Sequence, residues 1–564
     1  MQIKSQLNKI IEDSFKAIDI TPKSITVSDA TKPEFGDYQY NGAMALAKEL
    51  KTNPREIATK LANELEKQEI FSKVEVAGPG FINLTLNADF LAKNLPAALN
   101  ERAGVGTRVE PIKVVVDYSG PNMAKQMHVG HLRSTIIGDT IANLFEFLGD
   151  DVIRQNHIGD WGTQFGMLIA YFEENQKDID AKLSDLEEFY KAAKLRFDES
   201  EEFAAKSREY VVKLQGGDES CLKLWNAFIE KSLEHCQDVY NTLGVKLDKS
   251  NVKSESSYND DLANIVAQLE KSAVAKESQG AKCVFFDDSE NPLIVQKQDG
   301  GYLYATTDLA AVKFRVQELG AKRVCYVVDA RQSEHFKQVF ATAKKAGFAN
   351  EDTLLEHIAF GMMLDKSGRP FKTRDGGTVK LIDLISEAVT RAKDVIKKSD
   401  DYSQEELENI ARVIGIGSLK YADLSINRQS NYIFDWEKML SLDGNTALYM
   451  QYAYARINSI LTKAGDFEEV DPILGDELER RLALKILALE DNLQKAYIEA
   501  MPHVITSYLY ELATLFMRFY ENNPILKEDV AKEVKNSRLL LAKATANTIK
   551  KGLNILGIDV LDRI

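Results

Sequence analysis

Apolar positions follow two different patterns that alternate over the middle of the chain. Short runs rich in β-branched residues predict four strands, at residues 112–120, 150–159, 322–329 and 354–364. Between the first two runs, apolar residues three or four positions apart, from Leu132 to Leu148, predict an amphipathic helix. Strands that alternate with helices are typical of α/β proteins, so we expect a Rossmann-like, doubly wound parallel sheet.

The two ends of the chain carry other patterns. Residues 71–86 alternate apolar and polar positions around Gly78-Pro79-Gly80, which predicts a strand pair between helical segments at 1–20 and 42–68. Beyond residue 404, strand signals fade and amphipathic helical stripes follow one another. The chain therefore combines a small α/β N-terminal domain, the sheet domain and an all-α C-terminal bundle.

These patterns also predict where the domains begin and end. We expect an N-terminal domain at residues 1–105, a sheet domain at 110–400, a helical connector at 401–444 and a helical bundle at 445–564. Inside the sheet domain, residues 172–250 are charged and helical in pattern, and residues 254–303 have strand character. Both segments are predicted to be insertions. A chain of 564 residues is too long for a single core, which agrees with this division.

Composition and charge narrow the functional classes. The net charge of -15 argues against a general nucleic-acid binder, so no DNA partner is expected, although local basic faces remain compatible with RNA. No apolar stretch approaches the roughly 20 residues of a membrane span, and the N-terminus resembles neither a signal nor a transit peptide. The four cysteines show no metal-ligand spacing. We expect free thiols in a cytoplasmic protein without a protein-bound metal.

The most specific motif is His128-Val129-Gly130-His131, which lies between a predicted strand and a predicted helix. With only seven histidines and 32 glycines in the chain, chance rarely produces it. A helix N-terminus offers unpaired N–H groups to phosphate, a glycine allows close approach, and two imidazoles can donate hydrogen bonds to phosphate oxygens. Two ordinary helix-start histidines or a zinc pair are the alternatives. The motif favours a nucleotide site.

The motif and its surroundings resemble a known family. The segment HVGH resembles the HIGH signature of class I aminoacyl-tRNA synthetases, and residues 114–139 resemble the arginyl-tRNA synthetases of bacterial type. Further matching blocks extend the resemblance over essentially the whole chain: residues 157–166, 302–311, 327–336, 360–381 and 445–457, with FGDYQYN near the N-terminus.

The resemblance implies roles for residues in the nucleotide site. His128 and His131 would act on the ATP phosphates, and Gly130 and Met363 would complete ATP binding. The second class I signature, KMSKS, is not intact in this chain, and the sequence around Lys372 and Arg374 stands in its place. Lys372, Arg374 or the upstream Lys125 would supply the missing catalytic cation. A basic surface hairpin is the alternative for that loop.

A second set of residues would bind arginine. Carboxylates match the planar guanidinium in a bidentate way, which a site for arginine requires. By resemblance the pocket is lined by Asp117, Ser119, Asn122, Tyr304, Asp308 and Gln332. Asp308 could instead be a helix N-cap, and Tyr304 could be a core aromatic.

The resemblance further implies the reaction and its partners. L-arginine would be activated with ATP and Mg²⁺ to arginyl-adenylate and transferred to the terminal adenosine of tRNA(Arg), by a monomeric enzyme. The residues expected to contact tRNA are Tyr38, Gln39, Tyr449, Gln451, Tyr454 and Arg456, although some of these tyrosines are expected in the core. Two rival functions are a nucleotidyltransferase that shares the HxGH motif and a non-enzymatic RNA-binding paralogue.

Overall fold

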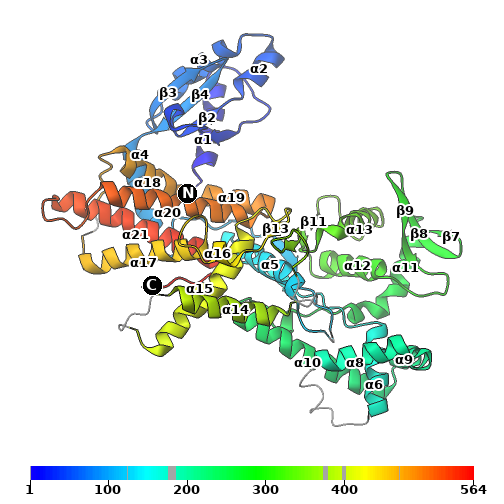
Figure 1. Cartoon of the computed structure of the whole chain (residues 1–564). Helices are drawn as coiled ribbons and strands as arrows, with labels where there is room; N and C mark the ends of the chain where they lie inside the picture. Colours follow the sequence, from blue (N-terminus) through cyan, green and yellow to red (C-terminus); the bar gives the residue numbers. More distant parts are fainter. Residues whose placement is uncertain (1, 124, 176–185, 372–378, 397–401, 469) are drawn as a thin grey trace.

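Three regions can be distinguished in the computed structural model (Figure 1). It describes residues 2–123, 125–175, 186–371, 379–396, 402–468 and 470–564. The N-terminal unit lies against one side of the helical bundle, and the parallel sheet with its insertions lies on another side. Among the described residues, no helix is both long and apolar enough to cross a lipid bilayer.

The N-terminal unit is a four-stranded antiparallel sheet covered by helices. The sheet has the order β1-β2-β4-β3, and the predicted strand pair is present as β3 and β4. Its elements are α1 (Ile3–Ala17), β1 (Val27–Asp29), η1 (Pro33–Phe35), β2 (Tyr38–Tyr40), α2 (Ala43–Leu50), α3 (Pro54–Leu65), β3 (Phe71–Ala77), β4 (Phe81–Leu86), α4 (Ala88–Asn94) and η2 (Leu95–Leu99).

The central sheet is parallel, as predicted, with the strand order β11-β10-β5-β6. Its strands are β5 (Lys113–Asp117), β6 (Asp151–Gln155), β10 (Arg323–Tyr326) and β11 (Leu354–His357). The chain moves from β5 through α5 (Val129–Leu148) to β6, and later returns to β10 on the opposite side of β5. The order therefore reverses between β5 and β10, where a doubly wound sheet opens its ligand crevice.

Helices flank the sheet, and the two segments predicted to be insertions contain helices in the first case and helices with a small sheet in the second. The first contains α6 (Thr163–Asn175), α8 (Leu186–Glu199), α9 (Glu201–Gln215), α10 (Glu219–Leu243) and η3 (Lys249–Asn251). The second contains η4 (Glu255–Asp261), α11 (Leu262–Lys271) and the antiparallel strands β7 (Lys276–Ser278), β8 (Ala281–Phe286) and β9 (Ser289–Gln296). Around β10 and β11 lie α12 (Tyr304–Lys313), the π-helical η5 (Phe314–Glu318), η6 (Ala330–Gln332) and α13 (Ser333–Lys345). The later helix α14 (Leu381–Val395) packs against α5 and α10.

The C-terminal region is helical, as the apolar stripes predict. It contains α15 (Gln404–Leu424), α16 (Trp436–Met439), α17 (Ala447–Ala464), α18 (Glu477–Leu487), α19 (Leu489–Glu499), α20 (Pro502–Asn522) and α21 (Lys532–Ile555). A short strand, β13 (Tyr432–Ile433), pairs in parallel with β12 (Met363–Leu364). All four cysteines are buried and free.

Buried and partly buried ion pairs join these regions. On α18, Arg480 donates two hydrogen bonds of 2.9 Å to Asp37 of the N-terminal unit. On α5, the Arg133 Nε donates to Asp423 of α15 at 2.9 Å, and both side chains are almost inaccessible to solvent. Arg133 also donates to the carbonyl of Ser430 at 3.1 Å. The helix that begins with the HVGH motif is thereby fixed to α15, the first helix of the C-terminal region.

The Arg133–Asp423 pair predicts a specific stability pattern. Asp423→Leu leaves the guanidinium buried without its carboxylate, which costs about 3–5 kcal/mol of unfolding free energy. The double variant Asp423→Leu with Arg133→Met removes both charges, and it should recover most of that loss. Urea unfolding followed by tryptophan fluorescence measures both effects. Equal destabilisation of the single and double variants would contradict this account of the pair.

Candidate active site

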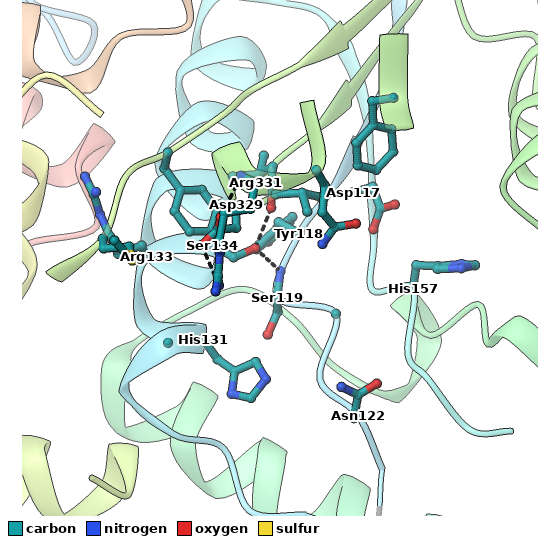
Figure 2. A pocket seen from close by; sticks show the side chains of 18 of the residues that line it. Asp117, Tyr118, Ser119, Asn122, His131, Arg133, Ser134, His157, Asp329 and Arg331 are labelled. Atoms are coloured by element: carbon teal, nitrogen blue, oxygen red, sulfur yellow. Dashed lines mark hydrogen bonds and ion pairs between the residues drawn. The ribbon is translucent and has the colours of Figure 1, made fainter. Parts of the chain in front are cut away.

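A cavity of about 970 Å³ opens at the reversal point of the sheet (Figure 2). Its wall is formed by the carboxyl ends of β5 and β10, the first turns of α5, α12 and α13, and the short strand β12. All six residues predicted to bind arginine line it: Asp117, Ser119, Asn122, Tyr304, Asp308 and Gln332. His128, Gly130, His131 and Met363 line the same cavity. The fold thus brings both predicted sets together.

The turn that follows β5 is held in an unusual backbone conformation. Ser119 has a φ of 72°, in the left-handed region that non-glycine residues rarely adopt. Its N–H donates to the Ser134 hydroxyl at 3.0 Å, and that hydroxyl donates to the Val327 carbonyl at 2.7 Å. Backbone strain of this kind persists where surrounding contacts determine it, often at functional sites. Here it directs the chain from β5 across the crevice toward α5.

The two histidines of the motif cap the start of α5. His128 is the N-cap residue, and its Nδ1 accepts a hydrogen bond from the Gly130 N–H at 3.0 Å. The His131 Nδ1 accepts from the His128 N–H at 3.1 Å. A neutral imidazole carries its hydrogen on the nitrogen that is not accepting, which is Nε2 in both rings. Each ring therefore retains one N–H donor beyond its capping bond.

Both imidazoles are neutral at physiological pH. Burial and the neighbouring His128 lower the pKa of His131 to about 3. Burial and the Lys125 ammonium lower the pKa of His128. A Cβ on Gly130 would lie 2.7 Å from the His128 ring, so glycine is the residue that lets this ring fold back over the helix start. The helix start thus presents uncharged donors.

Carboxylates form the opposite wall of the cavity. Asp117 accepts from the buried Arg315 of η5 at 2.8 Å, so its charge is already paired. Asp308 lies 2.6 Å from the Nε2 of His335. Burial, together with the charges of Asp308 and Asp160, raises the pKa of Glu255 to about 7. This wall is suited to a cationic ligand, because the added positive charge would stabilise carboxylates that repel one another.

The structure contradicts the alternative roles of two α12 residues, namely a helix N-cap for Asp308 and a core aromatic for Tyr304. Leu303 is the N-cap of this helix, and Asp308 lies one turn further along. Tyr304 is 63% exposed, which a core aromatic would not be. Its ring lies at the cavity wall, with its centroid 4.5 Å from that of His335.

Of the three residues predicted to supply the catalytic cation, the structure describes only Lys125. Lys125 is exposed, with its Nζ 4.8 Å from the centre of the Tyr190 ring. Lys372 and Arg374 lie outside the described residues. Met363 is buried at the cavity wall, and its sulfur accepts a hydrogen bond from the Tyr432 hydroxyl at 2.9 Å.

Several cavity residues were missed by the sequence analysis. His157 lies two residues after the end of β6, and the rule that ligands lie beyond strand carboxyl ends could have identified it. Its Nδ1 is buried and has no hydrogen-bond partner among the described residues. Glu255 and His335 also line the cavity. Glu255 lies in an insertion without a recognisable motif, so nothing local in the sequence identifies it.

The residues predicted to contact tRNA differ in their exposure. Tyr38 and Gln39 are buried in the N-terminal sheet, where Gln39 donates to Asn83 at 2.7 Å. On α17 the buried Gln451 donates to the Asp559 carbonyl at 2.9 Å, and Tyr454 is buried as well. The same helix leaves other side chains accessible: Tyr449 is half-buried, and Tyr452 and Arg456 are exposed.

Three models of known protein families match three successive regions of the chain. A model of the catalytic domain of class I tRNA synthetases (R) matches residues 94–436. A model of the arginyl-tRNA synthetase N-terminal domain matches residues 1–86, and a model of the DALR anticodon-binding domain matches residues 450–564. The first match alone covers more than half of the chain.

Individual relatives agree with these matches. An arginine–tRNA ligase of Chromobacterium violaceum is 51% identical, with 100% of each chain covered. Another, of Laribacter hongkongensis, is 53% identical over 94% of this chain and 95% of its own. The solved arginyl-tRNA synthetases of Plasmodium falciparum and Thermus thermophilus cover 100% of both chains, at 32% and 25% identity and TM-scores of 0.88 and 0.84. The chain therefore belongs to the arginyl-tRNA synthetases, within the class I aminoacyl-tRNA synthetases.

Proposed function

We propose that the cavity between β5 and β10 is where this arginine–tRNA ligase activates L-arginine with ATP and transfers it to tRNA(Arg). The observation that carries the proposal is the arrangement of the cavity itself. The start of α5, with His128 and His131, forms one wall, and a group of carboxylates forms the other. In the first step the arginine carboxylate attacks the α-phosphorus of ATP and releases pyrophosphate. In the second step the terminal adenosine of the tRNA takes the arginyl group and releases AMP.

At the helix wall, His128 and His131 act as neutral donors. Their Nε2–H groups would hydrogen-bond to phosphate oxygens while negative charge moves from the α-phosphoryl group to the leaving pyrophosphate. The positive end of the α5 dipole adds to this stabilisation. Mg²⁺ would accompany ATP as part of the substrate complex, held mainly by phosphate oxygens and water. Lys125, Lys372 and Arg374 are the cations proposed for the pyrophosphate end, and Met363 and Gly130 for the nucleoside side.

At the acidic wall, Asp308 and Glu255 are the proposed partners of the arginine guanidinium. Asp117 is less suited to that role because Arg315 already pairs with it. We assign Asp117 to the α-amino group of arginine. This group is an ammonium, and a single free carboxylate oxygen can accept a hydrogen bond from it. The remaining polar groups would complete the site, with Ser119, Asn122 and Gln332 around the backbone of the amino acid and Tyr304 over its side chain.

For the tRNA, we propose that the α17 face containing Tyr449, Tyr452 and Arg456 contacts unpaired anticodon bases. Exposed aromatic and guanidinium groups bind such bases by stacking and edge hydrogen bonds. The buried Gln451 and Tyr454 would support this face from within the bundle. Tyr38 and Gln39 would support the tRNA-contacting surface of the N-terminal unit in the same way. We further propose that the enzyme acts as a monomer in the cytoplasm.

Arginine-dependent exchange of pyrophosphate into ATP tests the proposed reaction directly. The enzyme should catalyse exchange when arginine and tRNA(Arg) are both present. Exchange without tRNA would also support the reaction, and it would show that activation does not require bound RNA. A folded protein that catalyses no exchange under either condition would contradict the proposal, and it would favour the RNA-binding paralogue.

Two substitutions of His131 separate capping from catalysis. Asparagine places an oxygen near the Nδ1 position, so His131→Asn keeps the acceptor for the His128 N–H and loses the outward donor. Glutamine places its amide nitrogen near the Nε2 position, so His131→Gln keeps the donor and loses the cap. We expect exchange about 10²–10³-fold slower for His131→Asn with little change in stability. For His131→Gln we expect faster exchange than for His131→Asn, and an unfolding free energy about 1 kcal/mol below that of the wild type.

Exchange rates and thermal unfolding of both variants provide the check. Equal rates in the two variants would show that the outward N–H does not act on the phosphates.

Arginine affinity should depend on pH through Glu255. In the free enzyme this carboxyl has a pKa of about 7, so it is largely protonated below pH 7. The bound guanidinium stabilises the carboxylate, and binding therefore releases a proton. Affinity should rise with pH by up to about tenfold per unit below pH 7 and level off above it. Isothermal titration calorimetry between pH 5.5 and 8 measures the slope.

The matched control is Glu255→Gln. This variant should bind arginine more weakly at pH 8, and it should lose the part of the slope that comes from Glu255. The same pH profile in the wild type and in Glu255→Gln would exclude Glu255 from guanidinium binding.

A further inference from the structure

His335 lies against Tyr304 and Asp308, the two α12 residues predicted to bind arginine. It belongs to the first turn of α13, three residues after Gln332. Its Nε2 is 2.6 Å from Asp308, and its ring centroid is 4.5 Å from that of Tyr304 at an interplanar angle of 49°. We propose that His335 is a positioning residue that holds Asp308 and Tyr304 for recognition of the arginine side chain. This inference rests on the proposed role of Asp308.

The hydrogen bond to Asp308 has a defined direction. An ionised carboxylate can only accept, so the Nε2 of His335 must donate to the Asp308 Oδ2. The two side chains are only 10% and 17% exposed, and a hydrogen bond shielded from water in this way is stronger than one at the surface. The bond restrains rotation of the carboxylate and leaves Oδ1 for an N–H of the guanidinium. A hydrogen bond from a guanidinium N–H depends on the direction of its acceptor, so this fixed orientation favours binding of the guanidinium.

The contact with Tyr304 restrains a largely exposed side chain. Tyr304 is the first residue of α12 and is 63% exposed, and its ring packs against the imidazole. Tilted aromatic pairs at such separations are attractive. One imidazole thus connects the carboxylate proposed to bind the guanidinium with the ring proposed to cover it. Since α12 and α13 flank the cavity, His335 also fixes the spacing between these two helices at the site.

A positioning role predicts a selective kinetic effect. Loss of the Nε2–H leaves Asp308 free to rotate, which weakens arginine binding before and during activation. The ATP site lies on the other wall, at the start of α5, and would not be affected. We therefore expect the KM for arginine to rise about 10- to 100-fold, from the size of hydrogen bonds to charged groups. The KM for ATP and kcat at saturating arginine should change by less than about threefold.

Two matched variants test the role of the Nε2–H. Glutamine places its amide nitrogen near the position of Nε2, so His335→Gln can still donate to Asp308. Asparagine reaches only to the position of Nδ1, so His335→Asn cannot. The KM for arginine should rise in His335→Asn and should return to within about threefold of wild type in His335→Gln. Equal KM values in the two variants, whether raised or unchanged, would overturn the inference.

Asp308→Asn separates this inference from the proposed function. If Asp308→Asn weakens arginine binding and His335→Asn does not, the positioning role fails and the arginine site stands. If Asp308→Asn has no effect, the proposed arginine site fails as well. An unchanged KM for ATP confirms that each variant is folded.

A measurement on the wild type covers the case in which a variant does not fold. In the ¹⁵N-histidine NMR spectrum, the His335 ring must carry a proton on Nε2. A ring protonated only on Nδ1 would overturn the proposal.

Discussion

Parallel pairing between β5 and β10 is the constraint on which the active site depends. It sets Asp117 beside Tyr326, so the chain leaves the two strands at the same edge of the sheet. The turn after β5 leads to α5, and the segment after β10 leads to α13. Both helices therefore begin at one cavity. The hydrogen bonds from Ser119 to Ser134 and from Ser134 to Val327 join the two exits, and the Arg133–Asp423 pair fixes α5 to the bundle.

The cavity separates two kinds of charge stabilisation. The helix wall would meet the phosphates with N–H groups that carry no net charge, since burial keeps His131 neutral. The opposite wall gathers carboxylates whose mutual repulsion a cation relieves. Within that wall the partners already present give the carboxylates different roles. Arg315 neutralises Asp117, and His335 orients Asp308, whereas Glu255 remains available for ligand charge. An amino acid with a cationic side chain and an ATP molecule would thus occupy defined ends of one site.

Local sequence patterns account for most of the fold and for part of the site. The four strands were predictable because β-branched runs such as Val114–Val116 are buried on both faces of the sheet. The position of the HVGH motif at a helix start was predictable because its residues are adjacent and follow a predicted strand. The place of Glu255 in the cavity was not predictable. It lies in an insertion, and its N–H donates to the carbonyl of the distant Ile158. Gln451 is polar, so its sequence suggests an exposed side chain. In the structure it is completely buried, and its amide donates to two backbone carbonyls. Such contacts join residues far apart in the chain, and no local pattern encodes them.

The central claim is that one cavity holds arginine against the acidic wall and the phosphates against the start of α5. A crystal structure with a non-hydrolysable arginyl-adenylate analogue would test it most directly. The account predicts the guanidinium within hydrogen-bonding distance of Asp308 and Glu255, and the phosphate mimic within reach of the Nε2 atoms of His128 and His131. A guanidinium bound elsewhere, or a phosphate mimic away from the helix start, would contradict it.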